Sequence, residues 1–350
     1  MGLVPMGDLL TQAKEYKFAV GGFDLLNLEM LAALEEAATE ATSPIILMIA
    51  EVHFKYLKVE DLAPAIRKVA QEAPIPVAVH LDHGVTLEAI MRAIRAGFSS
   101  VMFDGSKLPF EENVEKTADI VRFAHACGVT VEAELGHVGG GEGALTPKAA
   151  DEAAFTDPVN AAEFVRRTGV DALAIAVGNV HGIYKGEPNL DFDRIARIRD
   201  LCDIPLVLHG GSGISDDDFR KAISLGIAKI NIYTEMQMRL IQYMREYITE
   251  AGDKSEYTEL LLHQRRAVRE VAVQKMKVFG TYGLCGPNNP ACLNCGGCDV
   301  RANFADKTPA PSTKATAPVA STTVEAPDRA VIEAIRSEER RVGKECRSRW

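Results

Sequence analysis

Residues 206–234 read LVLHGGSGISDDDFRKAISLGIAKINIYT, and this stretch contains one strand–helix–strand unit. Apolar runs of strand length at 206–209 and 229–232 flank a segment with helical periodicity at 216–225. Each run is followed at once by small or polar residues, GGSG after the first and YT after the second. The stretch therefore predicts a βαβ unit with functional groups near the carboxyl ends of both strands.

The same unit repeats along the 350-residue chain. Apolar stretches of strand length alternate with longer segments rich in Ala, Glu, Lys and Arg. The predicted strands are 18–23, 45–50, 77–81, 100–103, 129–134, 172–177, 206–209 and 229–232. The predicted helices are 28–41, 59–71, 87–96, 111–126, 159–167, 192–201, 216–225 and 235–249. This repetition predicts an α/β fold, a (β/α)8 TIM barrel.

An open, doubly wound sheet is the alternative fold, because it also alternates strands and helices. That fold usually has fewer strands and often a Gly-rich turn after the first one, where this chain has no G-x-G-x-x-G. A barrel instead collects functional groups at the ends of several different strands. The sequence fits the barrel, with Asp24, Asp82, His83, Asp104, Glu134, His181, His209 and Asn231 at such positions.

The composition disfavours several classes of protein. There are 39 Lys and Arg against 49 Asp and Glu, and the resulting net charge of −10 argues against a nucleic-acid partner. No apolar run approaches the roughly 20 residues that cross a bilayer, and the first residues lack a signal-peptide pattern. We therefore expect a globular, cytoplasmic protein with no membrane partner.

The composition also divides the chain, with the barrel expected over residues 1–284. Residues 285–303 are Cys-rich, 304–327 read as a disordered Ala/Pro/Ser/Thr-rich linker, and 328–335 begin an amphipathic helix. The linker and helix resemble docking peptides of enzymes carried in bacterial microcompartments, so a compartment shell is a candidate partner. The last segment, RSEERRVGKECRSRW at 336–350, reads like a translated sequencing adapter, and we interpret it as an assembly artefact.

Four cysteines follow the barrel with the spacing C-x6-C-x2-C-x2-C. They are Cys285, Cys292, Cys295 and Cys298. Thiolates at such short spacing are suited to zinc or an iron–sulfur cluster. A reduced, flexible tail is the alternative, and the spacing does not decide between the two.

Three histidines follow three different predicted strands: His83 in HLDHG, His181 in AVGNVHG and His209 in LVLHGGSG. Imidazole suits zinc, and three protein ligands with one open position make a Lewis-acid site. Asp104 and Glu134 end neighbouring strands and are candidates for a second metal position or for contacts to the ligands. The pattern therefore predicts a catalytic metal at this rim.

Two further carboxylates are candidates for proton transfer. Asp82 directly precedes His83, so the two side chains point to opposite sides of the strand unless the chain turns there. A carboxylate beside a divalent metal can exchange a proton with a substrate hydroxyl, whereas the alternative is that Asp82 caps the helix beginning near Thr86. Glu142 lies in the Gly-rich segment GHVGGGEG, which is either an active-site loop or an ordinary exposed loop.

The turns after the seventh and eighth strands are typical of an anion site. Glycines allow backbone N–H groups to converge on an anion, and the dipole of the following helix assists. Phosphate sites of TIM barrels lie after these two strands. The candidates are Gly210, Gly211, Ser212, Asn231 and Thr234.

Together, the motifs HLDHG, VEAELG, GGGEG, AVGNVHG, VLHGGSG and KINIYTE resemble the class II, metal-dependent ketose-bisphosphate aldolases, the fructose/tagatose-bisphosphate aldolase family. The resemblance spans about residues 4–279. It implies an aldehyde-lyase that cleaves a ketose phosphate to dihydroxyacetone phosphate and an aldehyde. It also implies zinc held by His83, His181 and His209, a second zinc position at Asp104 and Glu134, and a homodimer or homotetramer.

The resemblance further implies a course for the reaction. Asp82 would accept the proton of the C4 hydroxyl, the C3–C4 bond would break, and Glu142 would return a proton to the carbanion. A sodium or potassium ion often assists near the phosphate-binding glycines. The implied substrate-binding residues are Gly182, Gly210, Gly211, Ser212, Asn231, Ile232, Tyr233 and Thr234.

Some positions depart from the family pattern. Family members commonly have Asn after the first strand and Ser or Thr after the second, where this chain has Asp24 and Ala50 followed by Glu51. The lost hydroxyl and the added carboxylates disfavour a phosphate there. Tyr233 stands where smaller or acidic residues are frequent. We therefore expect an aldolase that keeps dihydroxyacetone phosphate and takes an unusual aldehyde.

Two other classes of function remain alternatives. A metal-dependent hydrolase on the same barrel usually pairs two histidines on its first strand, where this chain has Phe23 and Asp24. A noncatalytic phosphosugar-binding barrel would keep the glycines but has no need of Asp82, Glu142 and three metal-type histidines together.

Overall fold

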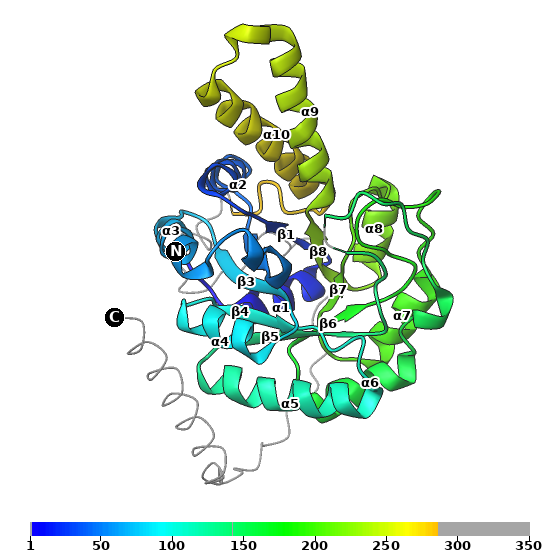
Figure 1. Cartoon of the computed structure of the whole chain (residues 1–350). Helices are drawn as coiled ribbons and strands as arrows, with labels where there is room; N and C mark the ends of the chain where they lie inside the picture. The colour runs from blue at the N-terminus through cyan, green and yellow to red at the C-terminus, as the bar shows by residue number, and fades with distance from the viewer. Residues whose placement is uncertain (1, 142, 286–350) are drawn as a thin grey trace. The chain divides into compact units, whose positions relative to one another are not determined.

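A closed barrel of eight parallel strands, in the order β1 to β8, forms the centre of the fold (Figure 1). The structure is a computed structural model, and it describes residues 2–141 and 143–285. Pairing of β1 with β8, with Gly21 opposite Ile230, closes the barrel. The strands are β1 Val20–Asp24, β2 Ile45–Ala50, β3 Val77–Gly84, β4 Ser100–Phe103, β5 Thr130–Leu135, β6 Ala172–Ile175, β7 Leu206–Leu208 and β8 Ile227–Ile232. The predicted (β/α)8 TIM barrel is confirmed.

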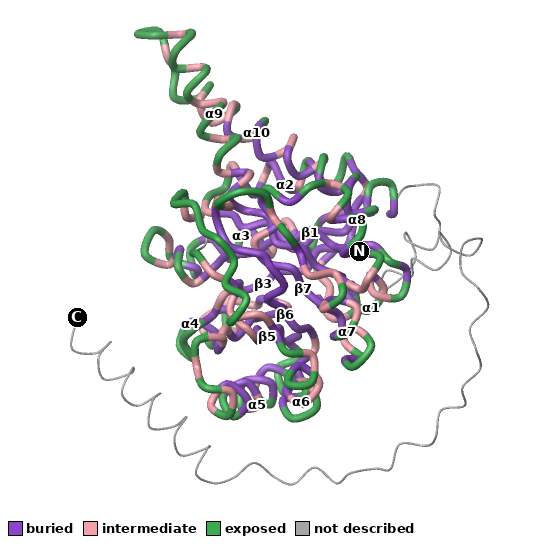
Figure 2. The backbone as a smooth tube through the Cα atoms, turned by 90° about the vertical axis from the view of Figure 1, so that its right-hand side faces the viewer, coloured by how far each residue is buried: buried purple, intermediate pink, exposed green. Residues whose placement is uncertain are grey.

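Helices follow the strands and cover the outside of the barrel. Figure 2 shows the strands buried and the outer sides of the helices exposed. Several helices begin where a side-chain oxygen accepts a first-turn N–H, as at Asn27, Asp157 and Ser215. The helices between the strands, with two short 3-10 helices, are α2 Leu28–Glu40, η1 Glu51–Lys55, α3 Val59–Glu72, α4 Leu87–Arg95, α5 Phe110–Ala126, η2 Glu152–Ala154, α6 Pro158–Thr168, α7 Phe192–Leu201 and α8 Asp216–Ser224.

Two helices, at 6–16 and 257–278, lie outside the predicted pattern. Helix α1, Met6–Tyr16, covers the end of the barrel where the strands begin, and its Gly7 N–H donates to Thr130 Oγ1 at 3.1 Å. After β8 the chain forms α9, Thr234–Ala251, and then α10, Tyr257–Val278. Helices α9 and α10 pack together as a hairpin that projects from the barrel (Figures 1 and 2). The carboxyl ends of the strands therefore remain the open end of the barrel.

Of the residues predicted to follow the barrel, the structure describes only Cys285. Cys285 is buried, and its N–H donates to the Thr42 carbonyl at 2.7 Å. The expectations for Cys292, Cys295 and Cys298, and for residues 304–350, fall outside the described residues. Among the described residues, no helix is both long and apolar enough to span a membrane.

Candidate active site

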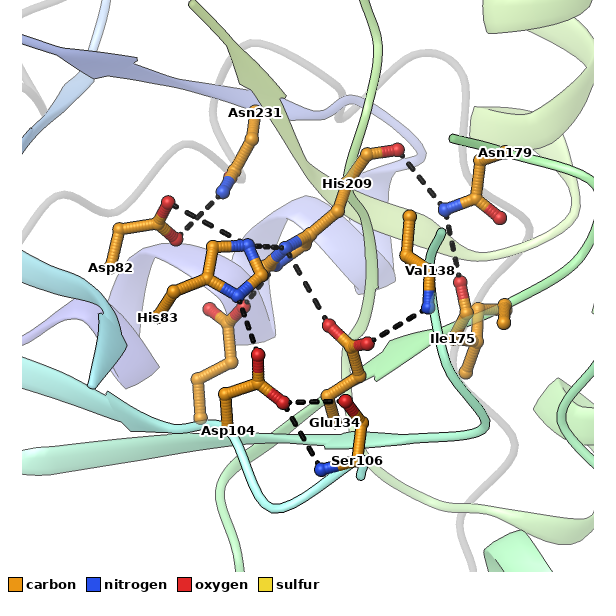
Figure 3. A network of polar contacts seen from close by, with 12 residues as sticks. Asp82, His83, Asp104, Ser106, Glu134, Val138, Ile175, Asn179, His209 and Asn231 are labelled. Carbon is orange, nitrogen blue, oxygen red and sulfur yellow. Dashed lines mark hydrogen bonds and ion pairs between the residues drawn. The ribbon is translucent and has the colours of Figure 1, made fainter. Parts of the chain in front are cut away.

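Four side chains from four strand ends converge at the open end of the barrel, and Figure 3 shows three of them, His83, Glu134 and His209. His83 belongs to β3 and Glu134 to β5, His181 lies in the loop after β6, and His209 directly follows β7. One ligand atom from each of these residues lies within 4.8 Å of the others. The structure therefore brings the three predicted histidines together, with Glu134 beside them.

A backbone turn at His83 explains how adjacent residues both reach the site. His83 has a φ of +43°, a left-handed conformation that is uncommon for a residue other than glycine. The β3–β4 register shifts between Leu81 and Gly84 at the same place. As a result Asp82 Oδ2 lies 3.9 Å from His83 Nε2 instead of on the opposite side of the strand. Such local strain is typical of functional sites.

The loop that carries His181 is held by neighbouring main chain. The His181 N–H donates to the Gly139 carbonyl at 2.8 Å, and a side chain at Gly182, whose φ is +84°, would meet the Ala144 carbonyl at 2.2 Å. The Asn179 amide donates to the His209 carbonyl at 3.0 Å and to the Ile175 carbonyl at 3.2 Å. Asn179 thus links the loops after β6 and β7. Its Asn-containing turn is visible in the sequence, but its partners are not.

The rings of His83 and His209 are oriented as metal ligands usually are. His83 Nε2 and His209 Nδ1 face one another at 2.8 Å. The other nitrogen of each ring is held by a carboxylate, Asp104 Oδ2 at 3.0 Å from His83 and Glu132 Oε1 at 2.8 Å from His209. Metal-binding histidines almost always donate their second N–H to such a partner.

Glu134 completes a donor set that suits a divalent cation. It is buried, and its Oε1 accepts from the Val138 N–H at 3.0 Å. Its Oε2 is also buried, has no hydrogen-bond partner and lies 3.9 Å from His209 Nδ1. An unpartnered buried carboxylate oxygen beside imidazole nitrogens fits a zinc site with three histidines and one carboxylate.

The close packing of these titratable groups shifts their pKa values in opposite directions. Burial and the neighbouring His83 hold the pKa of His209 well below its ordinary value. Burial also lowers the pKa of His83, but Asp82 and the hydrogen bond to Asp104 outweigh it, and the pKa lies well above its ordinary value. The two facing rings therefore share one proton between them. Burial and the nearby Asp104 raise the pKa of Glu134 to about 8.

Asp104 lies beside this group and not within it. Its Oδ2 contacts His83 Nδ1, and its Oδ1 accepts from the Ser106 hydroxyl at 2.6 Å. Ser106 in turn contacts His137 Nδ1 at 3.0 Å. In this structure Asp104 therefore positions His83, and its use as a second metal ligand stays a prediction.

Asp82 is held beside the histidines by Asn231 and does not cap a helix. Its Oδ1 accepts from the Asn231 amide at 2.9 Å, while its buried Oδ2 has no hydrogen-bond partner. Burial raises the pKa of Asp82, but His83 and His209 lower it by more than burial raises it. The net pKa lies below its ordinary value, so the carboxylate is ionised at neutral pH. Helix α4 is capped instead by Thr86, whose hydroxyl accepts from the Ala89 N–H.

Glu51 directly follows β2, as predicted, and its carboxylate has partners that the sequence did not indicate. Its carboxylate accepts from the N–H groups of Val85 and Thr86 and from the Thr86 hydroxyl, at 2.5, 3.0 and 2.7 Å. Because these groups lie at the start of α4, Glu51 binds the β3–α4 loop. The expectation that it repels a substrate phosphate is therefore not supported by its contacts.

The predicted phosphate-binding residues lie around the loops after β6, β7 and β8. Gly182, Ser212 and Thr234 line a cavity of about 820 Å3, and Ser212 Oγ accepts from the Glu235 N–H at the start of α9. Gly210 has a φ of +62°, and a side chain there would meet the Val180 carbonyl at 2.1 Å. The Gly211 N–H donates to the Asn231 carbonyl at 3.2 Å.

Two of the predicted residues, Ile232 and Tyr233, differ in their surroundings. Ile232 is fully buried in the apolar core. Tyr233 packs on His53, with 5.0 Å between ring centroids, and a side chain at Gly143 would meet the Tyr233 ring at 2.6 Å. Glu142 lies outside the described residues.

Two charged residues below the site were not predicted. Glu132 and Lys229 are fully buried and form an ion pair at 2.8 Å. A signal for them exists, because alternate residues of a strand share a face. Glu132 is two residues from Glu134, and Lys229 is two residues from Asn231, so all four face the barrel interior.

Comparisons with known proteins agree with this geometry. The family described as fructose-bisphosphate aldolase class-II matches residues 4–284. A probable fructose-bisphosphate aldolase of Bacillus subtilis (strain 168) is 45% identical over 284 residues, which are 80% of this chain and 99% of that protein. The fructose-bisphosphate aldolase of Geobacillus stearothermophilus is 43% identical over 286 residues, 81% of this chain and 99% of that protein. The crystal structure of the YdjI aldolase from Escherichia coli K12 matches with a TM-score of 0.70 and 40% identity, covering 80% of this chain and 98% of that one.

Proposed function

Because the chain belongs to the class-II fructose-bisphosphate aldolase family, we propose that it cleaves a ketose phosphate to dihydroxyacetone phosphate and an aldehyde, and catalyses the reverse condensation. It is accordingly an aldehyde-lyase of the aldolase type. The observation that carries the proposal is the convergence of His83, His181, His209 and Glu134 within 4.8 Å, with the ionised Asp82 next to them.

We propose zinc as the metal. His83, His181 and His209 would hold it, and the unpartnered Oε2 of Glu134 would be a further ligand. A bound zinc ion supplies a Lewis acid that stabilises negative charge developing on substrate oxygens. The second zinc position, the sodium or potassium ion and the metal on the Cys-rich segment stay predictions.

Asp82 is the proposed base of the cleavage direction. Asn231 binds its Oδ1, which leaves the unpartnered Oδ2 to accept the proton of the substrate's C4 hydroxyl. As that proton leaves, the C4–O bond becomes a carbonyl, and the electrons of the broken C3–C4 bond remain on the dihydroxyacetone phosphate half. We propose that Glu142 then returns a proton to C3.

The phosphate of the dihydroxyacetone half is proposed to bind after β7 and β8. Ser212 and Thr234 meet at the N-terminus of α9, an 18-residue helix whose dipole favours an anion. Gly210 and Gly211 precede Ser212 and pack so closely that a side chain at either would clash with a neighbouring backbone carbonyl, and we propose that they complete this phosphate site.

The aldehyde half is proposed to differ from that of a ketose bisphosphate. Ala50 pairs with Asp82 across β2 and β3, so the residue at position 50 borders the proposed base. A methyl group there donates no hydrogen bond to a phosphate. Nearby, the rings of His53 and Tyr233 pack on one another with 5.0 Å between their centroids. We therefore expect acceptors without a terminal phosphate to be preferred.

The test is release of dihydroxyacetone phosphate by the full chain from a panel of ketose mono- and bisphosphates. Chelator is expected to abolish release, added zinc to restore it, and Asp82→Asn to remove it while the variant still binds zinc. Release of inorganic phosphate instead would indicate the hydrolase alternative, and metal binding without turnover would refute the aldolase proposal. Equal turnover of fructose and tagatose 1,6-bisphosphates at glycolytic rates would refute the altered acceptor. The oligomeric state, the cytoplasmic location and the microcompartment partner stay predictions.

A further inference from the structure

An ion pair crosses the interior of the barrel directly below the candidate metal site. Lys229 on β8 and Glu132 on β5 are both fully buried, with 2.8 Å between Lys229 Nζ and Glu132 Oε2. Strands β5 and β8 are not neighbours in the barrel, so this contact spans its centre. Barrel interiors are usually filled by branched apolar side chains, and burial of two charges costs several kcal/mol of desolvation per ion.

Glu132 connects this pair to the candidate metal ligand His209. Its Oε1 lies 2.8 Å from His209 Nε2, while its Oε2 binds Lys229. An ionised carboxylate only accepts hydrogen bonds, so His209 Nε2 carries the proton of that contact. His209 Nδ1 then presents its lone pair toward His83 Nε2, at 2.8 Å. The tautomer of His209 therefore depends on Glu132 accepting this hydrogen bond and being held in place by Lys229.

Lys229 is the group with a full positive charge that binds Glu132. Besides His209, the imidazole ring of His80 lies near Glu132. Its Nε2 is 3.6 Å from Glu132 Oε2, and its Nδ1 contacts Ser100 Oγ at 2.9 Å. Without Lys229 the buried carboxylate would lose its charge-assisted hydrogen bond and its orientation.

We propose that Lys229 is a positioning residue of the metal site, which acts through Glu132 to hold His209 in the tautomer that binds metal through Nδ1. The inference rests on the metal site of the proposed function and not on the identity of the sugar. It makes Lys229 necessary for metal affinity, although Lys229 itself touches neither metal nor substrate.

The test measures metal binding and not turnover. In Lys229→Met, zinc affinity by chelator competition is expected to fall on the order of 10- to 100-fold, as for loss of other outer contacts to metal ligands. The visible spectrum of the cobalt-substituted variant is expected to shift, because the geometry at His209 changes. Glu132→Gln is expected to act in the same direction, since a neutral amide is a weaker acceptor.

Controls separate this role from a purely structural one. Val131→Ala changes the neighbouring buried residue of β5, which faces away from the barrel interior, and is expected to lower stability without changing zinc affinity. If Lys229→Met alone fails to fold, Glu132→Gln combined with Lys229→Met leaves neither charge buried alone, and is expected to fold and bind zinc at least about 10-fold more weakly.

The proposal would be overturned if folded Lys229→Met, or the double variant, had the zinc affinity and the cobalt spectrum of the unchanged protein. It would also be overturned if the unchanged protein bound no metal. A wild-type protein that binds zinc but cleaves no ketose phosphate would refute the proposed function alone, because the metal-binding readout would still stand.

Discussion

Removing the carboxylate of Glu51 tests whether this residue supports the loop behind His83 or sets substrate preference. Glu51→Ala deletes three hydrogen bonds, two to backbone N–H groups and one to the Thr86 hydroxyl. Hydrogen bonds to charged groups contribute about 1.5–3 kcal/mol each when buried, and these are exposed. We therefore discount the sum and expect a loss of about 2 kcal/mol in the free energy of unfolding, with about half of that for Glu51→Gln.

Urea unfolding followed by circular dichroism measures the loss, with the m-value expected to stay unchanged. Turnover is measured in parallel with a ketose monophosphate and a ketose bisphosphate. Because Glu51 binds the loop that follows His83, kcat/KM is expected to fall by the same factor for both substrates. A selective rise in kcat/KM for the bisphosphate, with unchanged stability, would refute this reasoning and return Glu51 to the role of a repelling charge in the substrate pocket.

Three further outcomes are expected. Phe164→Ala empties a fully buried position and is expected to lower the free energy of unfolding by about 3–5 kcal/mol, as measured by urea unfolding, whereas a loss below about 1 kcal/mol would contradict the packing. Gly182→Ala forces a methyl group to 2.2 Å from the Ala144 carbonyl at a φ of +84°, so zinc affinity is expected to fall at least about 10-fold by chelator competition; unchanged affinity would show that the loop adapts freely. Burial raises the pKa of Cys202 to about 11, so its thiolate is scarce at pH 8; peptide mass spectrometry should find the exposed Cys127 alkylated first, and the reverse order would contradict the burial.

The barrel was predictable because its signal repeats. Each strand–helix unit carries the same change of periodicity, and the eight repeats compensate for uncertain ends. Helix α1 was missed although Met6, Leu9, Leu10 and Ala13 have helical spacing, because it precedes the first strand and belongs to no unit. Helix α10 was missed for the same reason, since it follows the last unit.

The site was predictable in membership but not in geometry. Histidines after separate strands of a barrel must meet at one rim, so His83, His181 and His209 followed from the fold. The left-handed backbone conformation at His83 did not follow from the fold, because residues other than glycine rarely adopt it and no local sequence pattern indicates it. The contacts of Glu51 with the β3–α4 loop were not predictable either, because a residue after a strand faces either the barrel mouth or the next loop, and only tertiary packing decides.

The contacts that build the site join parts of the chain that are far apart in sequence. His83 meets His209 across 126 residues, Asp82 meets Asn231 across 149, and Glu132 meets Lys229 across 97. Closing loops of this length precedes any gain from the contacts, which makes such contacts late events in folding. During synthesis the first half of the barrel would leave the ribosome without a partner for Asp82 or Glu132. Metal acquisition is thus expected only after β8 has closed the barrel, so a fragment ending before β7 should bind zinc poorly even where it is folded.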